Sequence, residues 1–272
     1  MQVGVFAKTF PGSDPACVLA AVRDAGFAVT QFNLACAGLP SMPEDVPDEA
    51  IDAIDAAAKA SGIGLVALSG TYNMAHPDSR VRDDGLRRLA VVIEAAARLS
   101  IPLVTLCTGT RNPVDQWAHH PGNADPSAWA DMAREMEKAL RLAERHGVDL
   151  GIEPEQANIV TSADDAMRLI AEMGSKRLRV VLDPANLFEQ ANAEEARTVV
   201  AVAVERTAGH VSLAHAKDRF AEGRFATAGQ GVVDFADFIT RLKAAGFDGP
   251  LVTHGLPAEE APGVARFLRG LV

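Results

Sequence analysis

The feature that most limits the fold is a regular alternation of strand-like and helix-like segments along the whole chain. Expected strands, read from short apolar runs bounded by turn residues, cover residues 3–7, 28–33, 63–69, 102–107, 148–152, 178–182, 210–214 and 250–253. Expected helices, read from amphipathic periodicity, cover residues 14–25, 48–61, 80–99, 127–146, 162–173, 193–207, 233–245 and 258–271. Eight strand–helix pairs without a linker predict one α/β domain over residues 1–272, a closed (β/α)8 TIM barrel.

The alternative arrangement of such segments is an open, doubly wound parallel sheet. That fold is expected to carry a glycine-rich phosphate loop after its first strand, and residues 7–12 do not supply one. The later Gly229-Gln230-Gly231 follows no strand directly and is interpreted as a tight turn. The length of 272 residues is close to the roughly 250 typical of the barrel. We therefore expect the closed barrel.

Composition excludes several classes of partner. The net charge of −10 gives no basic field for nucleic acid or an acidic membrane surface. No apolar run approaches the roughly 20 residues of a membrane span, and the start of the chain has no features of a secretory signal. Cys17, Cys36 and Cys107 are odd in number and scattered in apolar segments, which predicts buried, reduced thiols. A cytoplasmic protein with a small-molecule partner is expected.

Four residues that can bind a metal follow strand-like runs in the second half of the chain. Glu153, Asp183, His215 and His254 each come directly after such a run. The carboxyl ends of the strands of a parallel barrel meet at one mouth, so these side chains should converge. Carboxylates crowded there repel one another unless a cation relieves them. Mixed oxygen and nitrogen ligands suit Mn²⁺, Co²⁺, Fe²⁺ or Zn²⁺, and the sequence predicts such a site.

The residues around these positions also resemble a known family. Glu153-Pro154, Asp183-Pro184-Ala185-Asn186 and His215-Ala216-Lys217-Asp218 resemble motifs of the xylose isomerase-like barrels, the sugar phosphate isomerase and epimerase superfamily. The resemblance implies a divalent metal held by Glu, Asp, His and a second Glu, with the two Glu residues moving a proton beside the substrate carbonyl. The implied function is a metal-dependent isomerase or epimerase acting on a keto sugar or a sugar phosphate. Its first three ligands correspond to Glu153, Asp183 and His215.

Several loop residues are candidates for substrate binding. The loops at residues 69–77 and 108–121 are similar to those of sugar-handling members of the family. Arg111 and Lys217 can bind a phosphate or carboxylate, although a strand-end Arg is about as often tied to a structural carboxylate. Trp117 can form a wall against a carbohydrate or meet a second subunit, which leaves a homo-oligomer open. The full set comprises Asn73, Arg111, Trp117, His120, Asn186 and Lys217, with Glu155 a further candidate for hydroxyl recognition.

The chain departs from the family pattern at the fourth ligand. The last strand ends on His254 where the family usually has Glu, and Asn186 stands where relatives often have His. We expect His254 to complete the metal set, but a metal-bound imidazole whose other nitrogen is held by a partner has no free base. Glu153 and His254 are therefore the predicted catalytic residues, with Glu153 the single base.

Two other functions stay open at this point. One base and one metal suffice for a dehydratase, a lyase acting on a keto-polyol. The loss of the second Glu also allows a sugar-binding barrel that no longer turns over a substrate. The apurinic endonucleases of the same superfamily match poorly, because they are expected to have more metal ligands and a basic groove.

Overall fold

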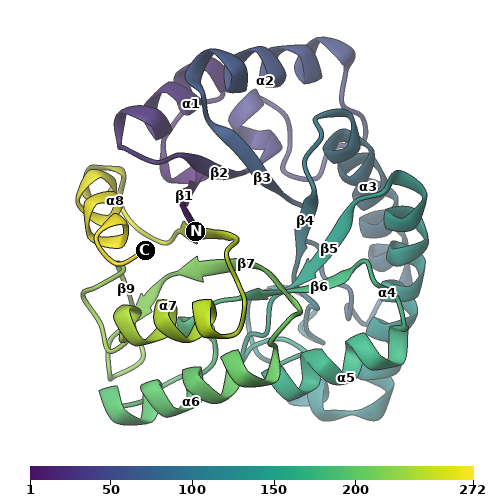
Figure 1. The fold of residues 1–272 in the computed structure, drawn as a ribbon. Helices are drawn as coiled ribbons and strands as arrows, with labels where there is room; N and C mark the ends of the chain where they lie inside the picture. The colour runs from purple at the N-terminus through teal and green to yellow at the C-terminus, as the bar shows by residue number, and fades with distance from the viewer.

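The computed structural model describes residues 1–272 and is a closed barrel of parallel strands inside a ring of helices (Figure 1). The barrel strands are β1 (Gln2–Phe6), β2 (Val29–Phe32), β3 (Gly64–Ser69), β4 (Leu103–Leu106), β5 (Asp149–Ile152), β6 (Leu178–Leu182), β7 (Val211–Ala216) and β10 (Pro250–Thr253). Their order around the barrel is β1-β10-β7-β6-β5-β4-β3-β2, so each strand pairs with its neighbour in sequence. The predicted (β/α)8 fold is confirmed.

The helices cover the outside of the barrel. They are α1 (Pro15–Asp24), α2 (Asp48–Ser61), α3 (Ser79–Arg98), α4 (Pro126–His146), α5 (Ala163–Met173), α6 (Ala193–Arg206), α7 (Phe235–Ala244) and α8 (Ala261–Arg269). Short 3-10 turns are η1 (Ala7–Thr9), η2 (Leu34–Ala37), η3 (Pro121–Ala124), η4 (Pro184–Asn186) and η5 (Ala258–Glu260). The last helix, α8, packs against the first strand, β1, and so closes the ring (Figure 1). None of the helices is long and apolar enough to cross a lipid bilayer.

Two apolar clusters hold the structure together. The larger one contains 68 buried residues, most of them where helices meet the outer face of the sheet. The smaller one contains Ala67, Leu103, Val181, Leu213 and Val252 and fills the interior of the barrel. Side chains two residues apart in a strand point the same way. This apolar plug therefore forms the floor beneath the side chains that follow it in each strand.

The structure differs from the predicted boundaries at three places near the mouth. β7 continues to Ala216, because His215 and Ala216 pair with β10, so His215 lies within the strand. The last helix divides into η5 and α8 at Pro262, which lacks an N–H and fits only a first turn. A small hairpin of β8 (Asp218–Arg219) and β9 (Phe225–Ala226) was not predicted, since two-residue strands carry no periodicity.

The cysteines are free thiols, as expected, but they are not all buried. Cys36 and Cys107 are buried, and burial raises the pKa of the Cys36 thiol to about 11. Cys17 is exposed on the outer face of α1, where its thiol contacts the Asp14 carboxylate at 3.4 Å. The expectation of a buried thiol is wrong for Cys17, because an apolar neighbourhood in sequence does not say which face of the helix a residue occupies.

Candidate active site

The barrel strands bring the four predicted metal-binding residues to one point. Asp183, His215 and His254 lie two residues beyond Val181, Leu213 and Val252 of the apolar plug, and so stand directly above it. Glu153 stands in the same way above Gly151, where an added Cβ would lie 2.7 Å from a Val181 methyl group. The two-residue repeat along each strand thus places two carboxylates and two imidazoles side by side above the apolar plug.

Their ligand atoms lie close together. One atom from each of the four residues falls within 4.8 Å of the others, and no other group of this kind occurs in the chain. The Nε2 of His254 is 2.9 Å from the Oδ2 of Asp183, and the Nδ1 of His215 is 3.3 Å from the Oε1 of Glu153. The two imidazole ring centroids are 4.4 Å apart. This convergence is the geometry that a single bound cation requires.

The protonation states of the cluster also suit a cation. Burial opposes ionisation of Asp183, but the positive charge of Lys217 and a hydrogen bond from His254 hold its pKa below the usual range. Burial, with the nearby charges of His215 and Lys217, lowers the pKa of His254. For Glu153, burial is outweighed by His215, so its pKa is also lowered. Near neutral pH the cluster offers carboxylates and a neutral imidazole, which are the forms that bind Mn²⁺, Co²⁺, Fe²⁺ or Zn²⁺.

A cavity of about 230 Å³ opens above the cluster. It is smaller than the 300 to 1,000 Å³ typical of drug-sized ligands, and it is lined by Gln31, Trp117, Glu153, Glu155, Asn186, His215, Lys217 and His254 among others. The Nζ of Lys217 lies 2.6 Å from the Oδ1 of Asn186, 3.3 Å from the Oδ2 of Asp183 and 4.1 Å from the centre of the Phe225 ring. Lys217, Asn186 and Trp117, three of the expected substrate-binding residues, thus line the cavity.

The Asn186 side chain links the lysine to the predicted base. Its Nδ2 donates to the Oε1 of Glu153 at 2.7 Å, while its Oδ1 accepts from Lys217. Oε1 also faces His215, whereas the Oε2 of Glu153 has no hydrogen-bond partner in the protein and is not sealed from solvent. Oε2 is thus the one carboxylate oxygen of the four-residue cluster that no protein group engages. The Nδ1 of His254 likewise has no protein partner, so no second residue holds that nitrogen.

Glu155 is a second acid in the cavity. Its Oε2 accepts a hydrogen bond from the Nδ2 of Asn158 at 3.0 Å. Burial and the neighbouring Glu153 charge raise the pKa of Glu155 to about 7. The side chain is therefore poised between its neutral and charged forms near physiological pH.

Gln31 is a site residue that the sequence reasoning missed. It comes from β2, is buried, and lies 2.8 Å through its Oε1 from the Nε2 of His215. Its Nε2 donates to the Oγ1 of Thr105 on β4 at 3.2 Å. The available signal was an amide side chain within a strand otherwise made of Val29, Thr30 and Phe32.

Three predicted substrate-binding residues do not line the cavity. Arg111 donates to the Ala75 carbonyl and pairs with Asp131 at 2.7 Å. The Oδ1 of Asn73 accepts from the Thr110 and Ala75 backbone, and the Nδ1 of His120 accepts from the Gly122 N–H as the cap of η3. These polar groups are already used to hold the loops after β3 and β4. A direct role for them in substrate binding stays a prediction, and these contacts do not support it.

The Asp218 carboxylate organises the loop that carries Lys217. It is fully buried and accepts backbone N–H bonds from Arg219, Gly229, Gly231 and Val233. A Cβ at position 231 would lie 2.4 Å from this carboxylate, so glycine is required there. The predicted turn at residues 229–231 is confirmed, and its function is to wrap an aspartate.

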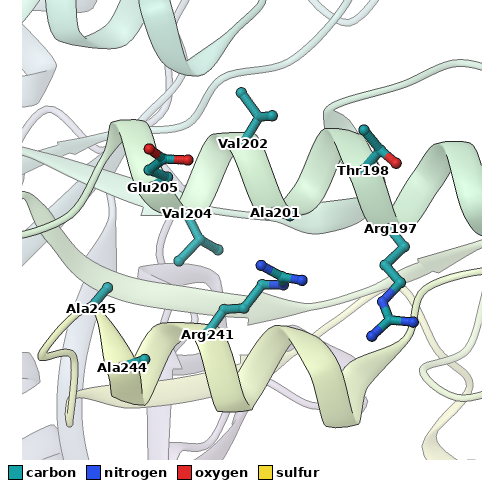
Figure 2. Close-up of a pocket in the computed structure, with 9 residues that line it drawn as sticks. All are labelled: Arg197, Thr198, Ala201, Val202, Val204, Glu205, Arg241, Ala244 and Ala245. Atoms are coloured by element: carbon teal, nitrogen blue, oxygen red, sulfur yellow. The ribbon is translucent and has the colours of Figure 1, made fainter.

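A second groove, of about 500 Å³, lies outside the barrel between α6 and α7 (Figure 2). Arg197 and Arg241 reach into the space between the two helices, and both pair with Asp237, at 2.9 and 2.6 Å. The groove contains no cluster of metal-binding residues. The cavity at the barrel mouth is therefore the candidate active site.

Comparisons with known structures agree with this architecture. The chain is similar over 99% of both chains to 3-keto-D-glucoside 4-epimerase from E. coli, with a TM-score of 0.78 and 18% identity. It matches D-psicose 3-epimerase from Clostridium cellulolyticum H10 over 100% of this chain and 99% of that one, with a TM-score of 0.76 and 16% identity. For D-allulose 3-epimerase from Methylomonas sp., the coverage is 100% and 98%, the TM-score 0.77 and the identity 15%. At these identities the likeness shows the fold.

Sequence comparison gives the family. No curated protein matches the chain significantly in sequence. The profile of the xylose isomerase-like TIM barrels, by contrast, matches residues 19–271. That span contains all four residues of the candidate metal-binding cluster and nearly all of the barrel. The chain therefore belongs to the xylose isomerase-like TIM-barrel family.

Proposed function

We propose that this protein is a metal-dependent isomerase or epimerase of a small, uncharged keto sugar. The observation that supports this most is the convergence of Glu153, Asp183, His215 and His254 at the floor of a small polar cavity. The similar solved structures include epimerases of keto sugars and of a 3-keto-glucoside. A bound divalent ion would polarise the carbonyl and hydroxyl oxygens of the substrate.

Glu153 is the proposed base. Its unpaired Oε2 takes the proton from the carbon beside the carbonyl, and the electron pair of the broken C–H bond moves into the carbonyl group. The carboxylic acid so formed then returns the proton. Return to the former carbonyl carbon, with transfer of the hydroxyl proton of the deprotonated carbon to the neighbouring oxygen, moves the carbonyl group by one carbon and so interconverts a ketose and an aldose. Asn186 holds the other carboxylate oxygen by donating to it from Nδ2, which fixes the direction of Oε2.

His254 is not a proposed second base. Its Nε2 faces Asp183 and the cluster, and the two nitrogens of an imidazole ring point in divergent directions. Nδ1 therefore points away from a substrate held over the cluster. One base acting on one face favours isomerisation without inversion at the carbon that loses its proton.

The charges around the cavity favour a substrate without phosphate. Lys217 is the only Lys or Arg that lines the cavity, and it is engaged by Asn186 and Asp183. Arg219 nearby donates to the carbonyls of Ala185, Glu189 and Gly223. Arg111 is paired with Asp131. A phosphate would therefore meet carboxylates without a free guanidinium.

Incubation of the Mn²⁺- or Co²⁺-loaded protein with a panel of keto sugars and sugar phosphates in D₂O tests the proposal. We expect deuterium at a single carbon next to the carbonyl of an unphosphorylated sugar, without inversion there, and loss of exchange in Glu153→Gln. Inversion at that carbon would show that a second base exists. Release of water with formation of a deoxy-diketone would instead establish the dehydratase. A protein that binds the sugars without exchange would be the altered binding barrel.

A further inference from the structure

We propose that Gln31 is a positioning residue for the metal centre, acting through His215. It accepts a hydrogen bond from Nε2–H of His215, and so leaves the lone pair of Nδ1 free to face the cluster. The inference rests on the proposed metal site and adds a residue from the opposite side of the barrel. Gln31 itself is not one of the four converging ligands.

The two nitrogens of His215 have different surroundings. Nδ1 lies 3.3 Å from the Oε1 of Glu153 and 3.8 Å from the Oδ2 of Asp183, so it is the nitrogen that points to the cluster. Nε2 points the other way, to Gln31 at 2.8 Å. Neutral imidazole carries one proton, and the nitrogen that binds a metal must be the unprotonated one. With a metal on Nδ1, Nε2 must therefore be the donor.

An acceptor is then required opposite Nε2, and Gln31 supplies it. The site is dry on that side, because His215 is 3% and Gln31 6% exposed. An imidazole N–H buried without an acceptor would lose its hydration without compensation. The carbonyl oxygen of the Gln31 amide faces this N–H, and its NH₂ group donates to Thr105.

Thr105 alone does not determine which way the amide points. Its hydroxyl can donate or accept, so it accommodates the amide in either orientation. The reversed amide would donate to Nε2, move the imidazole proton to Nδ1 and block the cluster. Choice of the imidazole tautomer therefore lies with the Gln31–His215 pair, and metal binding and this amide orientation stabilise each other.

The test measures Zn²⁺ affinity by competition with a chromophoric chelator. Gln31→Leu, which retains size but not the acceptor, should weaken binding by about 10- to 100-fold, as loss of such outer partners does. Gln31→Glu should bind within about threefold of the wild type, because a carboxylate accepts the same hydrogen bond. Thr30→Val is the matched control on the same strand, because its hydroxyl bonds to the backbone carbonyls of Val5 and Gln31 and to neither side chain of the Gln31–His215 pair. It should leave the affinity unchanged.

A second measurement does not depend on any variant folding. In Zn²⁺-loaded wild-type protein labelled with ¹⁵N-histidine, His215 should carry a slowly exchanging proton on Nε2. A proton on Nδ1, or a Gln31→Leu protein that binds Zn²⁺ as tightly as the wild type, would overturn the inference while leaving the metal centre intact. Failure of the wild type to bind Zn²⁺, Mn²⁺ or Co²⁺ would overturn the metal centre and this inference together.

Discussion

The two halves of the barrel mouth carry similar residue types but use them differently. β5, β6, β7 and β10 are contiguous in the barrel and supply all four members of the candidate metal-binding cluster. The loops after β3 and β4 also supply polar residues, among them Asn73, Arg111 and His120. These are bound to backbone groups and to Asp131. The difference lies in the hydrogen-bonding capacity that remains after folding.

A polar side chain that can still bind a ligand thus differs from a structural one in having an atom without a hydrogen-bond partner in the protein. Oε2 of Glu153 has no partner and opens to solvent, while the Arg111 guanidinium contacts a carbonyl, a hydroxyl and a carboxylate. A polar group that the protein leaves without a partner is satisfied by water or by a ligand. In the half formed by β5 to β10, part of that requirement is left for a ligand.

The largest expected effect is on metal affinity, and it comes from replacing one aspartate in each half. Asp183→Asn should weaken Zn²⁺ or Mn²⁺ binding by more than the 10- to 100-fold typical of an outer partner, because it removes a charged ligand. Asp131→Asn, the matched change among the arginines of the other half, should lower the unfolding temperature without changing metal affinity. Calorimetric metal titration of both proteins checks this. Equal metal affinities would show that the two halves do not differ in this way.

Replacing one cationic residue in each half should affect substrate binding in one half and folding stability in the other. Lys217→Met should raise KM by about 10-fold or more, because a hydrogen bond from a charged group is worth about 1.5 to 3 kcal/mol. Arg111→Met should leave KM unchanged but cost about 2 to 4 kcal/mol of unfolding free energy, since it removes one of the three arginines at Asp131 and the donor to the Ala75 carbonyl. Steady-state kinetics and urea unfolding measure the two effects. A raised KM in Arg111→Met would return that residue to the substrate site.

The same comparison explains what the sequence could predict. Local pattern identified every barrel strand and helix, because the strands are apolar runs bounded by turn residues and the helices are long enough to repeat an amphipathic period. The cluster was predictable because Glu153, Asp183 and His254 follow strand-like runs, and parallel strands bring their ends together.

Gln31 and the role of Asp218 could not be predicted in the same way. Both depend on partners distant in sequence, such as His215 for Gln31 and Gly231 for Asp218. The pairing of Arg111 could not be predicted, for the same reason. The Arg111 guanidinium is suited to binding a phosphate. In the structure, however, it is paired with Asp131 of α4. The residue type determines which hydrogen bonds and ion pairs a side chain can make. Only the packed structure shows which of them it makes within the protein.

A smaller effect is expected on the pH dependence of stability in metal-free protein, and it comes from Glu155. The folded-state pKa of Glu155 is about 7, above its ordinary value of 4.5. Between these values the unfolded chain ionises and the folded protein does not, so stability falls as pH rises and the loss is complete above about pH 7. Glu155→Gln removes this loss and should be more stable than wild type at pH 8, by on the order of 1 to 3 kcal/mol. Thermal unfolding at pH 5 and pH 8 should show the difference growing with pH; a constant difference would contradict it.

The smallest effect concerns His120, which tests whether the half formed by β3 and β4 is purely structural. Its Nδ1 caps η3 by accepting the Gly122 N–H at 3.1 Å. His120→Ala should cost up to about 1 kcal/mol of unfolding free energy, and His120→Asn should restore most of it, since Asn is a preferred cap. Both variants should keep the wild-type kcat/KM, because His120 is not among the residues that line the cavity. If instead both lost activity about tenfold while melting as the wild type does, this imidazole would contact the substrate, and the division between the two halves of the mouth would fail.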